Sequence, residues 1–246
     1  MAERLYRDIG NKIRRELAKS SLAIGDKLPT EREYAELFGV SRTLVREAFI
    51  MLEIEELIEV RKGSGSYLRN NLTSEPVNRV SDVGPFELLQ ARQVLESAIA
   101  AQAALTITKT DIKELLETLE LEGAEIDSAE KANAADRNFH LLIARSTQNA
   151  LLLDTATRLW DMRDGNPMWQ QLHSRIKDSS YHGQWLEDHR QVMVQLKKRN
   201  ANGARDAMWQ HLENVKQTLF DLSDTEDPDF DGYIFAQPTN QQLGSP

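Results

Sequence analysis

Three of the five histidines stand on apolar stripes in the second half of the chain, and one of them follows an aspartate by four residues. That spacing places Asp136 and His140 on one face of a helix predicted over residues 128–147. Imidazoles and a carboxylate buried without partners would be costly, whereas one shared divalent metal ion satisfies them together. The sequence therefore predicts a metal site made by Asp136, His140, His189 and His211.

Three nitrogen ligands and one oxygen ligand suit Zn, Ni, Mn, Co or Fe, with coordination positions left for a further ligand. A lone histidine on an apolar face is more often a hydrogen-bonded core residue, and a helical domain that serves only dimerisation would bind no metal. A metal-dependent hydrolase is a further alternative. It requires a general base beside the metal, for which Glu96 is the only candidate, so we expect no enzyme.

A second group of polar residues lies near the N-terminus, on two short helices predicted over residues 30–39 and 41–55. A glycine-containing turn between two short helices is typical of a helix-turn-helix. The first turns of the second helix would enter the major groove of DNA, where the planar guanidinium of arginine can bond guanine O6 and N7 together. The residues expected to contact DNA from these helices are Arg32, Ser41, Arg42, Thr43 and Arg46.

Two short strands are predicted next, over residues 57–61 and 66–68, and a Gly-Ser-Gly turn joins them as the wing of a winged helix. Lys62, Gly63 and Gly65 are expected to contact DNA, because glycine lets the backbone approach a groove edge. The alternative for each basic residue is a solvated surface. Only the group as a whole, placed by a capped helix, favours DNA binding.

The rest of the chain shows helical periodicity, so the predicted fold is mainly α. We expect a winged helix-turn-helix over residues 1–70, a linker over 71–84, an all-α antiparallel helical bundle over 85–222 and a C-terminal tail over 223–246 that is ordered in part at best. The bundle helices are expected at about 85–105, 109–123, 128–147, 150–164, 184–199 and 201–222.

The charge is distributed unevenly between these parts. The net charge is -9, but residues 1–70 carry 13 basic and 12 acidic side chains, so the acidic excess lies in the remainder. A nearly neutral domain still binds phosphates when its basic residues share a face. The chain has no cysteine and no apolar run approaching the roughly 20 residues needed to cross a bilayer. We expect a cytoplasmic protein without a membrane partner.

Residues 25–68, which include the segments LPTERE, VSRTLVREA and GSG, resemble the DNA-binding signature of the GntR superfamily of transcription regulators. The resemblance implies a homodimer that binds palindromic double-stranded operator DNA through the helix and wing residues given above. Glu56 departs from the family pattern, which usually has glycine at this position. We expect either a left-handed backbone there, at a cost of about 1 kcal/mol, or a different helix cap.

The segments DRNFHLLIA, EDHRQVMVQLKKRN and AMWQHLENV resemble the ligand-sensing FCD domain of the FadR subfamily. The resemblance implies that the aspartate and the three histidines hold a metal inside the bundle. It also implies that Arg92 faces the pocket and pairs with an effector carboxylate, the alternative being an ion pair with Glu96 one turn away.

Within that subfamily, GPFELLQARQVLES, NPMW and FDGYIF are similar to stretches of the hexuronate-utilisation repressors. This likeness implies a repressor of hexuronate catabolism genes that a sugar acid such as fructuronate, galacturonate or glucuronate releases from its operator. Another small carboxylate is the alternative effector. The residues expected to contact the effector are Arg92, Glu96, Asn149, Trp160 and Arg163.

Overall fold

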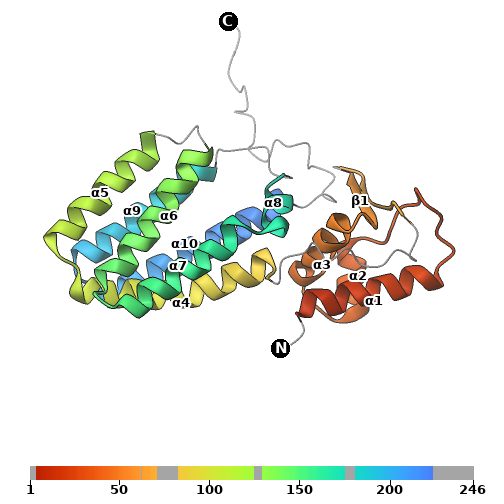
Figure 1. Cartoon of the computed structure of the whole chain (residues 1–246), viewed down its shortest axis with the longest axis horizontal. Helices are drawn as coiled ribbons and strands as arrows, with labels where there is room; N and C mark the ends of the chain where they lie inside the picture. Colours follow the sequence, from red (N-terminus) through yellow and green to blue (C-terminus); the bar gives the residue numbers. More distant parts are fainter. Residues whose placement is uncertain (1–3, 62, 71–82, 125–128, 175–180, 224–246) are drawn as a thin grey trace, which may run out of the picture.

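The computed structural model describes residues 4–61, 63–70, 83–124, 129–174 and 181–223, and these residues form ten α-helices and one two-stranded sheet. The N-terminal helices and the hairpin lie at one end of an elongated bundle formed by the later helices (Figure 1). The mainly α fold predicted from the sequence is therefore confirmed. No helix among these residues is both long enough and apolar enough to span a bilayer. The predicted linker and tail lie almost wholly outside the described residues, and their boundaries stay predictions.

The elements follow one another in a simple order, with the two strands between the third and fourth helices. They are α1 (Leu5–Lys19), α2 (Glu31–Phe38), α3 (Arg42–Ile54), β1 (Ile58–Arg61), β2 (Gly65–Leu68), α4 (Pro85–Thr106), α5 (Lys109–Ala124), α6 (Ala129–Ser146), α7 (Ala150–Asp164), α8 (Pro167–Ser174), α9 (Tyr181–Lys197) and α10 (Ala201–Leu222).

Local capping signals set the ends of the two short N-terminal helices. The Thr30 hydroxyl accepts the backbone N–H of Glu33, whose carboxylate accepts the Thr30 N–H in return, so α2 begins with a capping box. Gly39 ends α2 in the left-handed conformation, with φ of 64°. The Ser41 hydroxyl then accepts the N–H of Leu44 and starts α3 at the position predicted.

The turn after α3 takes the left-handed alternative. Glu56 has φ of 60°, and its N–H donates to the Glu53 carbonyl at 2.9 Å. The N–H of Leu57 reaches back to the Leu52 carbonyl, also at 2.9 Å. These bonds satisfy carbonyls that the end of a helix leaves open, so the strained residue is held by its neighbours.

The wing is an antiparallel hairpin in which Ile58 of β1 lies opposite Leu68 of β2. Gly63 and Gly65 have φ of 67° and 108°, values that side-chain-bearing residues rarely adopt, which explains the glycines of the turn. Lys62, predicted to contact DNA, lies outside the described residues.

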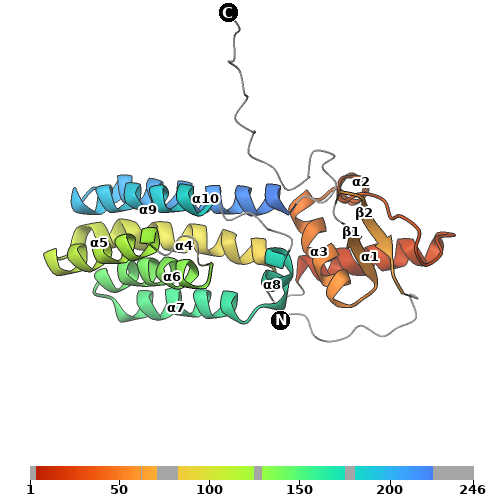
Figure 2. The same ribbon diagram turned by 90° about the horizontal axis from the view of Figure 1, so that it is seen from above.

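In the bundle, α4 packs along α10 and also contacts α6, α7 and α9, while α5 packs against α6 and α9 (Figure 2). The long predicted helices are present, but α9 begins at Tyr181, three residues before the predicted start, and α8 has no counterpart among the predicted helices. Asn166 caps α8 by accepting the N–H groups of Met168 and Trp169, and Pro167 occupies its first position. The eight residues of α8 are too few to show a clear helical period of apolar residues in the sequence.

The two halves share one hydrophobic cluster. Phe49 of α3 belongs to the same cluster as Met168 and Leu172 of α8, Phe86 of α4 and Leu219 of α10. Helix α3 also packs directly against α8 and the start of α4. Helix α3, which is predicted to enter the major groove of DNA, is thus packed against the end of the bundle formed by α8 and the start of α4.

Candidate metal centre and nucleic-acid interface

Four side chains from three helices converge inside the bundle, and they are the four predicted from the sequence. Asp136 and His140 come from α6, His189 from α9 and His211 from α10, and one ligand atom of each lies within 4.8 Å of the others. The Nε2 atoms of His189 and His211 are 3.1 Å apart, and Asp136 Oδ1 lies 3.4 Å from His140 Nε2. All three rings are buried. This arrangement of three nitrogens and one oxygen fits a divalent metal ion.

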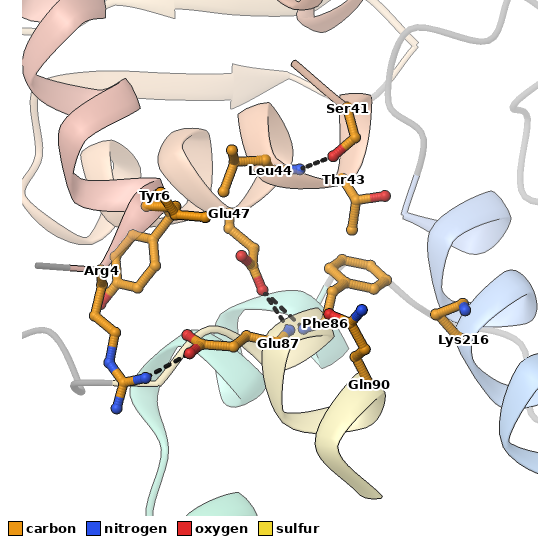
Figure 3. A pocket seen from close by; sticks show the side chains of 11 residues that line it. Arg4, Tyr6, Ser41, Thr43, Leu44, Glu47, Phe86, Glu87, Gln90 and Lys216 are labelled. Carbon is orange, nitrogen blue, oxygen red and sulfur yellow. Dashed lines mark hydrogen bonds and ion pairs between the residues drawn. The ribbon is translucent and has the colours of Figure 1, made fainter. Parts of the chain in front are cut away.

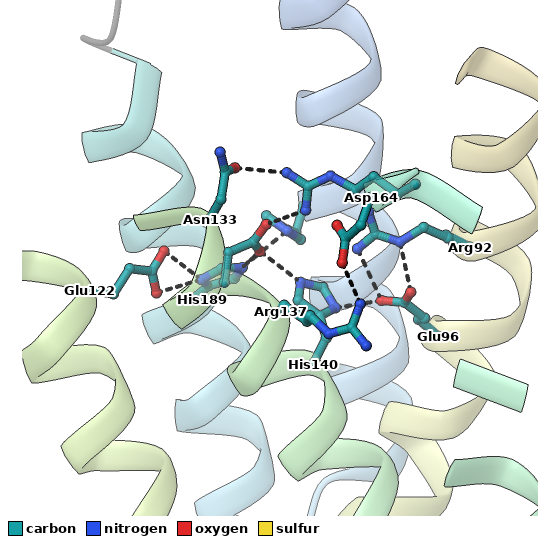
Figure 4. A network of polar contacts seen from close by, with 11 residues as sticks. Arg92, Glu96, Glu122, Asn133, Arg137, His140, Asp164 and His189 are labelled. Atoms are coloured by element: carbon teal, nitrogen blue, oxygen red, sulfur yellow. Dashed lines mark hydrogen bonds and ion pairs between the residues drawn. The ribbon is translucent and has the colours of Figure 1, made fainter. Parts of the chain in front are cut away.

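Each imidazole faces a carboxylate with its outer nitrogen. Glu122 of α5 contacts His189 Nδ1 at 2.9 Å, Asp188 of α9 lies 3.6 Å from His211 Nδ1, and Glu96 of α4 pairs with His140 Nδ1. Histidines that bind metals usually have their second nitrogen held in this way, which orients the ring and makes it a better donor. The outer carboxylates therefore direct all three Nε2 atoms to the centre, and Figure 4 shows the pairs of Glu122 with His189 and of Glu96 with His140.

Aromatic packing fixes the same rings. Phe139 is completely buried beside the site, and its ring stacks on the ring of His189 with 4.4 Å between centroids. Trp160 of α7 lies 5.3 Å from the ring of His140. Both histidines are held in their rotamers by large neighbours, which preorganises the cluster.

The electrostatics of the cluster favour a cation. Burial and the neighbouring His189 lower the pKa of His211 to about 3, so this ring is neutral at physiological pH. Burial would raise the pKa of Asp136, but His140 and Arg163 outweigh it and hold this pKa well below the usual value. Burial would lower the pKa of His140, yet Glu96 and Asp136 together raise it. A bound metal ion would replace the proton that Glu96 and Asp136 stabilise on His140.

Two guanidinium groups lie beside the cluster. Arg92 donates from Nε to Glu96 at 2.8 Å, which is the one-turn ion pair expected as its alternative, and stands 3.9 Å over the Trp160 ring. Arg163 bonds Asp136 Oδ2 at 3.2 Å and Asn133 Oδ1 at 2.7 Å, and its guanidinium also lies 4.7 Å from the centroid of the Trp160 ring. Each guanidinium is already paired with a carboxylate, so an anionic ligand would have to share or displace one of these pairs.

Of the predicted effector contacts, the structure brings together Arg92, Glu96, Trp160 and Arg163 but leaves Asn149 apart. Asn149 is the cap of α7, where its Oδ1 accepts the N–H groups of Leu151 and Leu152. Trp160 lies eleven residues further along α7, about 16 Å along the helix axis. The side chain of Asn149 therefore serves the helix end, and its contact with an effector stays a prediction.

Sequence reasoning missed several residues around the cluster. A cavity of about 10 Å³, room for one water molecule, lies next to Asp136 and is also lined by Asn133, Glu122, His182 and Trp185. The Trp185 indole N–H is buried and has no hydrogen-bond partner in the described part of the chain. A carboxylate or indole on an amphipathic helix has no sequence signal that sets it apart from an ordinary surface or core residue.

Some of the residues predicted to contact DNA lie on the surface of the N-terminal half, and others lie on the face that packs against the bundle. Arg32 is exposed and pairs with Glu36 on the next turn of α2 at 3.1 Å, so its guanidinium remains accessible. Ser41 serves as the cap of α3, and Thr43 of the first turn lines a cavity between the two halves. Gly63 is exposed at the tip of the wing.

Arg46 is the exception, because the structure buries it completely. Its Nε donates to Glu31 at 2.8 Å, and its Nη1 donates to the Ser223 hydroxyl at 3.0 Å and to the Phe220 carbonyl. The guanidinium also lies 4.2 Å over the Phe220 ring, and that of Arg42 lies 5.3 Å from it. The end of α10 therefore binds the guanidinium of Arg46, the side chain that the sequence assigns to base recognition.

Two family descriptions match the chain. Residues 5–68 match the bacterial regulatory proteins of the gntR family, and residues 87–214, more than half of the chain, match the FCD domain. The chain belongs to the GntR family of regulators with an FCD domain. Members of this family regulate transcription, which confirms the expectation of a DNA-binding regulator and not an enzyme.

Curated relatives cover nearly the full length of this GntR-family chain. It is 51% identical over 237 residues to the Uxu operon regulator of Haemophilus influenzae, which covers 96% of the chain and 89% of the relative. It is 40% identical over 240 residues to the Exu regulon transcriptional regulator of Escherichia coli K12, covering 95% and 92%. The solved structure of E. coli McbR/YncC shares the fold, with a TM-score of 0.51, 21% identity and coverage of 90% of this chain and 99% of that one.

Proposed function

We propose that this chain is a repressor of hexuronate catabolism genes. It would bind a palindromic operator as a homodimer and release it when a hexuronate binds beside a divalent metal ion in the bundle. The observation that carries the proposal is the convergence of the aspartate, the three imidazoles and two buried guanidiniums at one place. Relatives named as Uxu and Exu regulators support the effector class.

Asp136, His140, His189 and His211 would hold the ion, and their donor set suits Zn, Ni, Mn, Co or Fe. When bound, such an ion supplies a Lewis-acid centre that attracts a carboxylate oxygen.

The chain's own groups would recognise the rest of the sugar acid. Arg163 has the geometry for a bidentate contact with the effector carboxylate, since its guanidinium already bonds one carboxylate and one amide oxygen. Trp185 lines the adjacent cavity, and its buried indole N–H would donate to a sugar hydroxyl. Charge and hydroxyl groups on one small molecule would thus meet complementary partners beside Asp136.

Effector binding has to move side chains, because the cavity at the cluster accepts only about one water molecule. Arg163 is the group best placed to transmit this movement. Its guanidinium lies 5.1 Å over the ring of Trp169 in α8, and α8 packs directly on α3. A shift of Arg163 toward the effector would therefore reach α3, the recognition helix expected to enter the major groove, through the short helix α8.

In a homodimer, operator binding requires the two recognition helices to fit major grooves about 34 Å apart. An effector that binds the other arrangement more tightly shifts the population away from this spacing. A difference of about 1.4 kcal/mol between the two states changes occupancy tenfold. The proposal needs only this modest preference.

The effector assignment is tested by titrating DNA complexes with fructuronate, galacturonate and glucuronate, with lactate as a different small carboxylate. The duplex used is one that the chain itself selects from a random-sequence library. A hexuronate is expected to dissociate the complex in the presence of zinc or manganese and to act more weakly after chelation. Indifference to every hexuronate would remove this effector class, and a response to lactate alone would favour the alternative carboxylate.

A matched pair of arginines separates recognition from general charge effects. Arg163→Gln is expected to weaken hexuronate binding about 10- to 100-fold, the range for a lost charge-assisted hydrogen bond. Arg137→Gln is the control, because Arg137 follows Asp136 in sequence but pairs on the surface with Asp161 and Asp164 (Figure 4). Equal effector affinity in both variants, measured by calorimetry, would contradict the role of Arg163.

The hydroxyl contact has a similar test. Trp185→Phe keeps the aromatic bulk but removes the indole N–H, so it should lower hexuronate affinity several-fold, about the effect of one neutral hydrogen bond. Metal affinity, measured in the same protein without effector, should stay unchanged. A parallel loss of metal binding would mean that the side chain acts on the cluster and not on the sugar.

A further inference from the structure

The first turns of the recognition helix face the bundle. Thr43 and Leu44 of α3 line a cavity of about 560 Å³ between the two halves, together with Phe86 of α4 and Lys216 of α10 (Figure 3). These positions lie at the end of α3 that a helix-turn-helix inserts into the major groove. A duplex at this end of α3 would have to enter the space between α3 and the bundle.

Two consecutive residues of α3 hold it against the bundle, Arg46 through the end of α10 and Glu47 through the start of α4. Arg46 is fully buried against the end of α10, where its Nη1 donates to the Phe220 carbonyl and the Ser223 hydroxyl, while its Nε donates to Glu31 of α2. Bringing this guanidinium to a base edge requires that both contacts with the end of α10 be broken. The contact is therefore in direct competition with base recognition.

Glu47 makes the second contact, with the start of α4. Its Oε1 accepts the backbone N–H of Phe86 at 2.8 Å and that of Glu87 at 3.0 Å. Gly84, the N-cap residue that precedes α4, has no side chain to cap these groups, so a carboxylate from the other half of the molecule does so. Burial raises the pKa of Glu47 to about 7, which reflects how completely the carboxylate is enclosed.

Gly84 is required by this approach. A Cβ atom at this position would lie 2.3 Å from Glu47 Oε1 and 2.4 Å from its carboxyl carbon. The backbone itself, with φ of -70°, suits any residue. The reason for glycine here is the space that the Glu47 carboxylate occupies.

We infer that the docked arrangement is an autoinhibited state of the regulator, in which the bundle withholds the recognition helix α3 from DNA. Two contacts hold it there: Glu47 of α3 with the start of α4, and Arg46 of α3 with the end of α10. Operator binding requires release of both contacts. The helices that hold α3 are also connected to the metal cluster, since His211 of the cluster lies on α10 and Glu96, which pairs with His140, lies on α4. The inference rests on the DNA-binding role of α3 and is independent of the effector's identity.

Gly84→Ala tests the inference without changing the recognition helix or the metal cluster. Its methyl group displaces the Glu47 carboxylate, weakens the docked state and raises the fraction of molecules competent to bind. Because apparent affinity scales with that fraction, we expect binding tighter by about tenfold to a duplex selected by the wild-type chain from a random library. Gly183→Ala is the control, since a Cβ there meets nothing within 4 Å.

Ser223→Ala provides a second variant on the other contact. It removes the hydroxyl that accepts from Arg46 but leaves the Phe220 carbonyl, so we expect a smaller increase in DNA affinity, about threefold. Circular dichroism and metal binding of each variant verify that the bundle remains intact.

Amide hydrogen exchange gives a readout in the unmodified protein. N–H groups in the first turn of a helix have no partner within it, so the protection of Phe86 and Glu87 depends on Glu47. Saturation with the selected duplex should accelerate their exchange. Retained protection in the DNA complex overturns the inference by itself, as does unchanged or weaker DNA binding by folded Gly84→Ala. Failure of every hexuronate to act would leave these results unaffected and bear only on the proposed effector.

Discussion

Removal of one imidazole tests the proposed metal site most directly. His211→Ala deletes a buried ring whose Nε2 lies 3.1 Å from His189 Nε2 and whose Nδ1 faces Asp188 at 3.6 Å. Burial and His189 lower the pKa of His211 to about 3, so at neutral pH no proton competes for its Nε2. The substitution therefore removes a proposed ligand that Asp188 already orients and that is neutral at this pH.

The expected magnitude follows from linkage. A metal that binds only the folded state stabilises it by about 2.7 kcal/mol when its free concentration is about 100 times Kd. Loss of a group that merely orients a ligand lowers metal affinity about 10- to 100-fold, so loss of a ligand should exceed about 100-fold. The same metal concentration would then stabilise the variant by at most about 0.4 kcal/mol. For a chain of this size the wild-type gain corresponds to about 5 to 11 °C in Tm.

The assay is thermal unfolding of chelator-stripped protein titrated with zinc, nickel, manganese and cobalt. The quantity compared is the metal-induced change in Tm, because the cavity left by His211→Ala lowers the starting Tm on its own. His173→Ala is the matched control, since His173 of α8 has a buried Nε2 but lies outside the four-residue cluster. Equal metal-induced shifts in wild type and His211→Ala would refute the assignment of His211 as a ligand.

Three further predictions concern groups around the cluster and the docked face. Glu122→Gln removes the charge that orients His189 and should lower metal affinity about 10- to 100-fold in calorimetry; unchanged affinity would contradict this role. Burial raises the pKa of Glu47 to about 7 from 4.5, so the folded state binds more protons between these values and stability falls as pH rises through this window. Glu47→Gln should remove that slope in urea unfolding at pH 5 and pH 8, and an identical slope in the variant would be contrary evidence. Phe139→Ala deletes a fully buried ring and should cost about 3 to 5 kcal/mol, a smaller loss meaning that the site collapses around it.

Short-range signals account for the elements that the sequence predicted. Thr30, Gly39 and Ser41 act on backbone groups within four residues, so their effects on α2 and α3 are visible in the chain itself. The inward direction of the three cluster histidines also follows from helical period, because each shares a stripe with apolar residues that must be buried.

Contacts across helices account for what the sequence missed. Glu122 appears on α5 like a solvated carboxylate until packing of α5 against α9 brings it to His189. A single sequence contains no signal for this contact, since it depends on which helices lie next to each other. The capping of α7 by Asn149 is different, because it acts on the N–H groups of Leu151 and Leu152 and is a local signal that the sequence analysis overlooked.

The sequence alone determined the winged helix-turn-helix, the helical bundle and the four candidate metal ligands, because periodicity and capping operate over a few residues of one chain segment. Only the tertiary structure decided that Arg46 is held by α10 and that Glu47 caps α4. The physical reason is that a buried guanidinium or carboxylate is stable only with partners, and here those partners lie about 40 and more than 170 residues away in the chain.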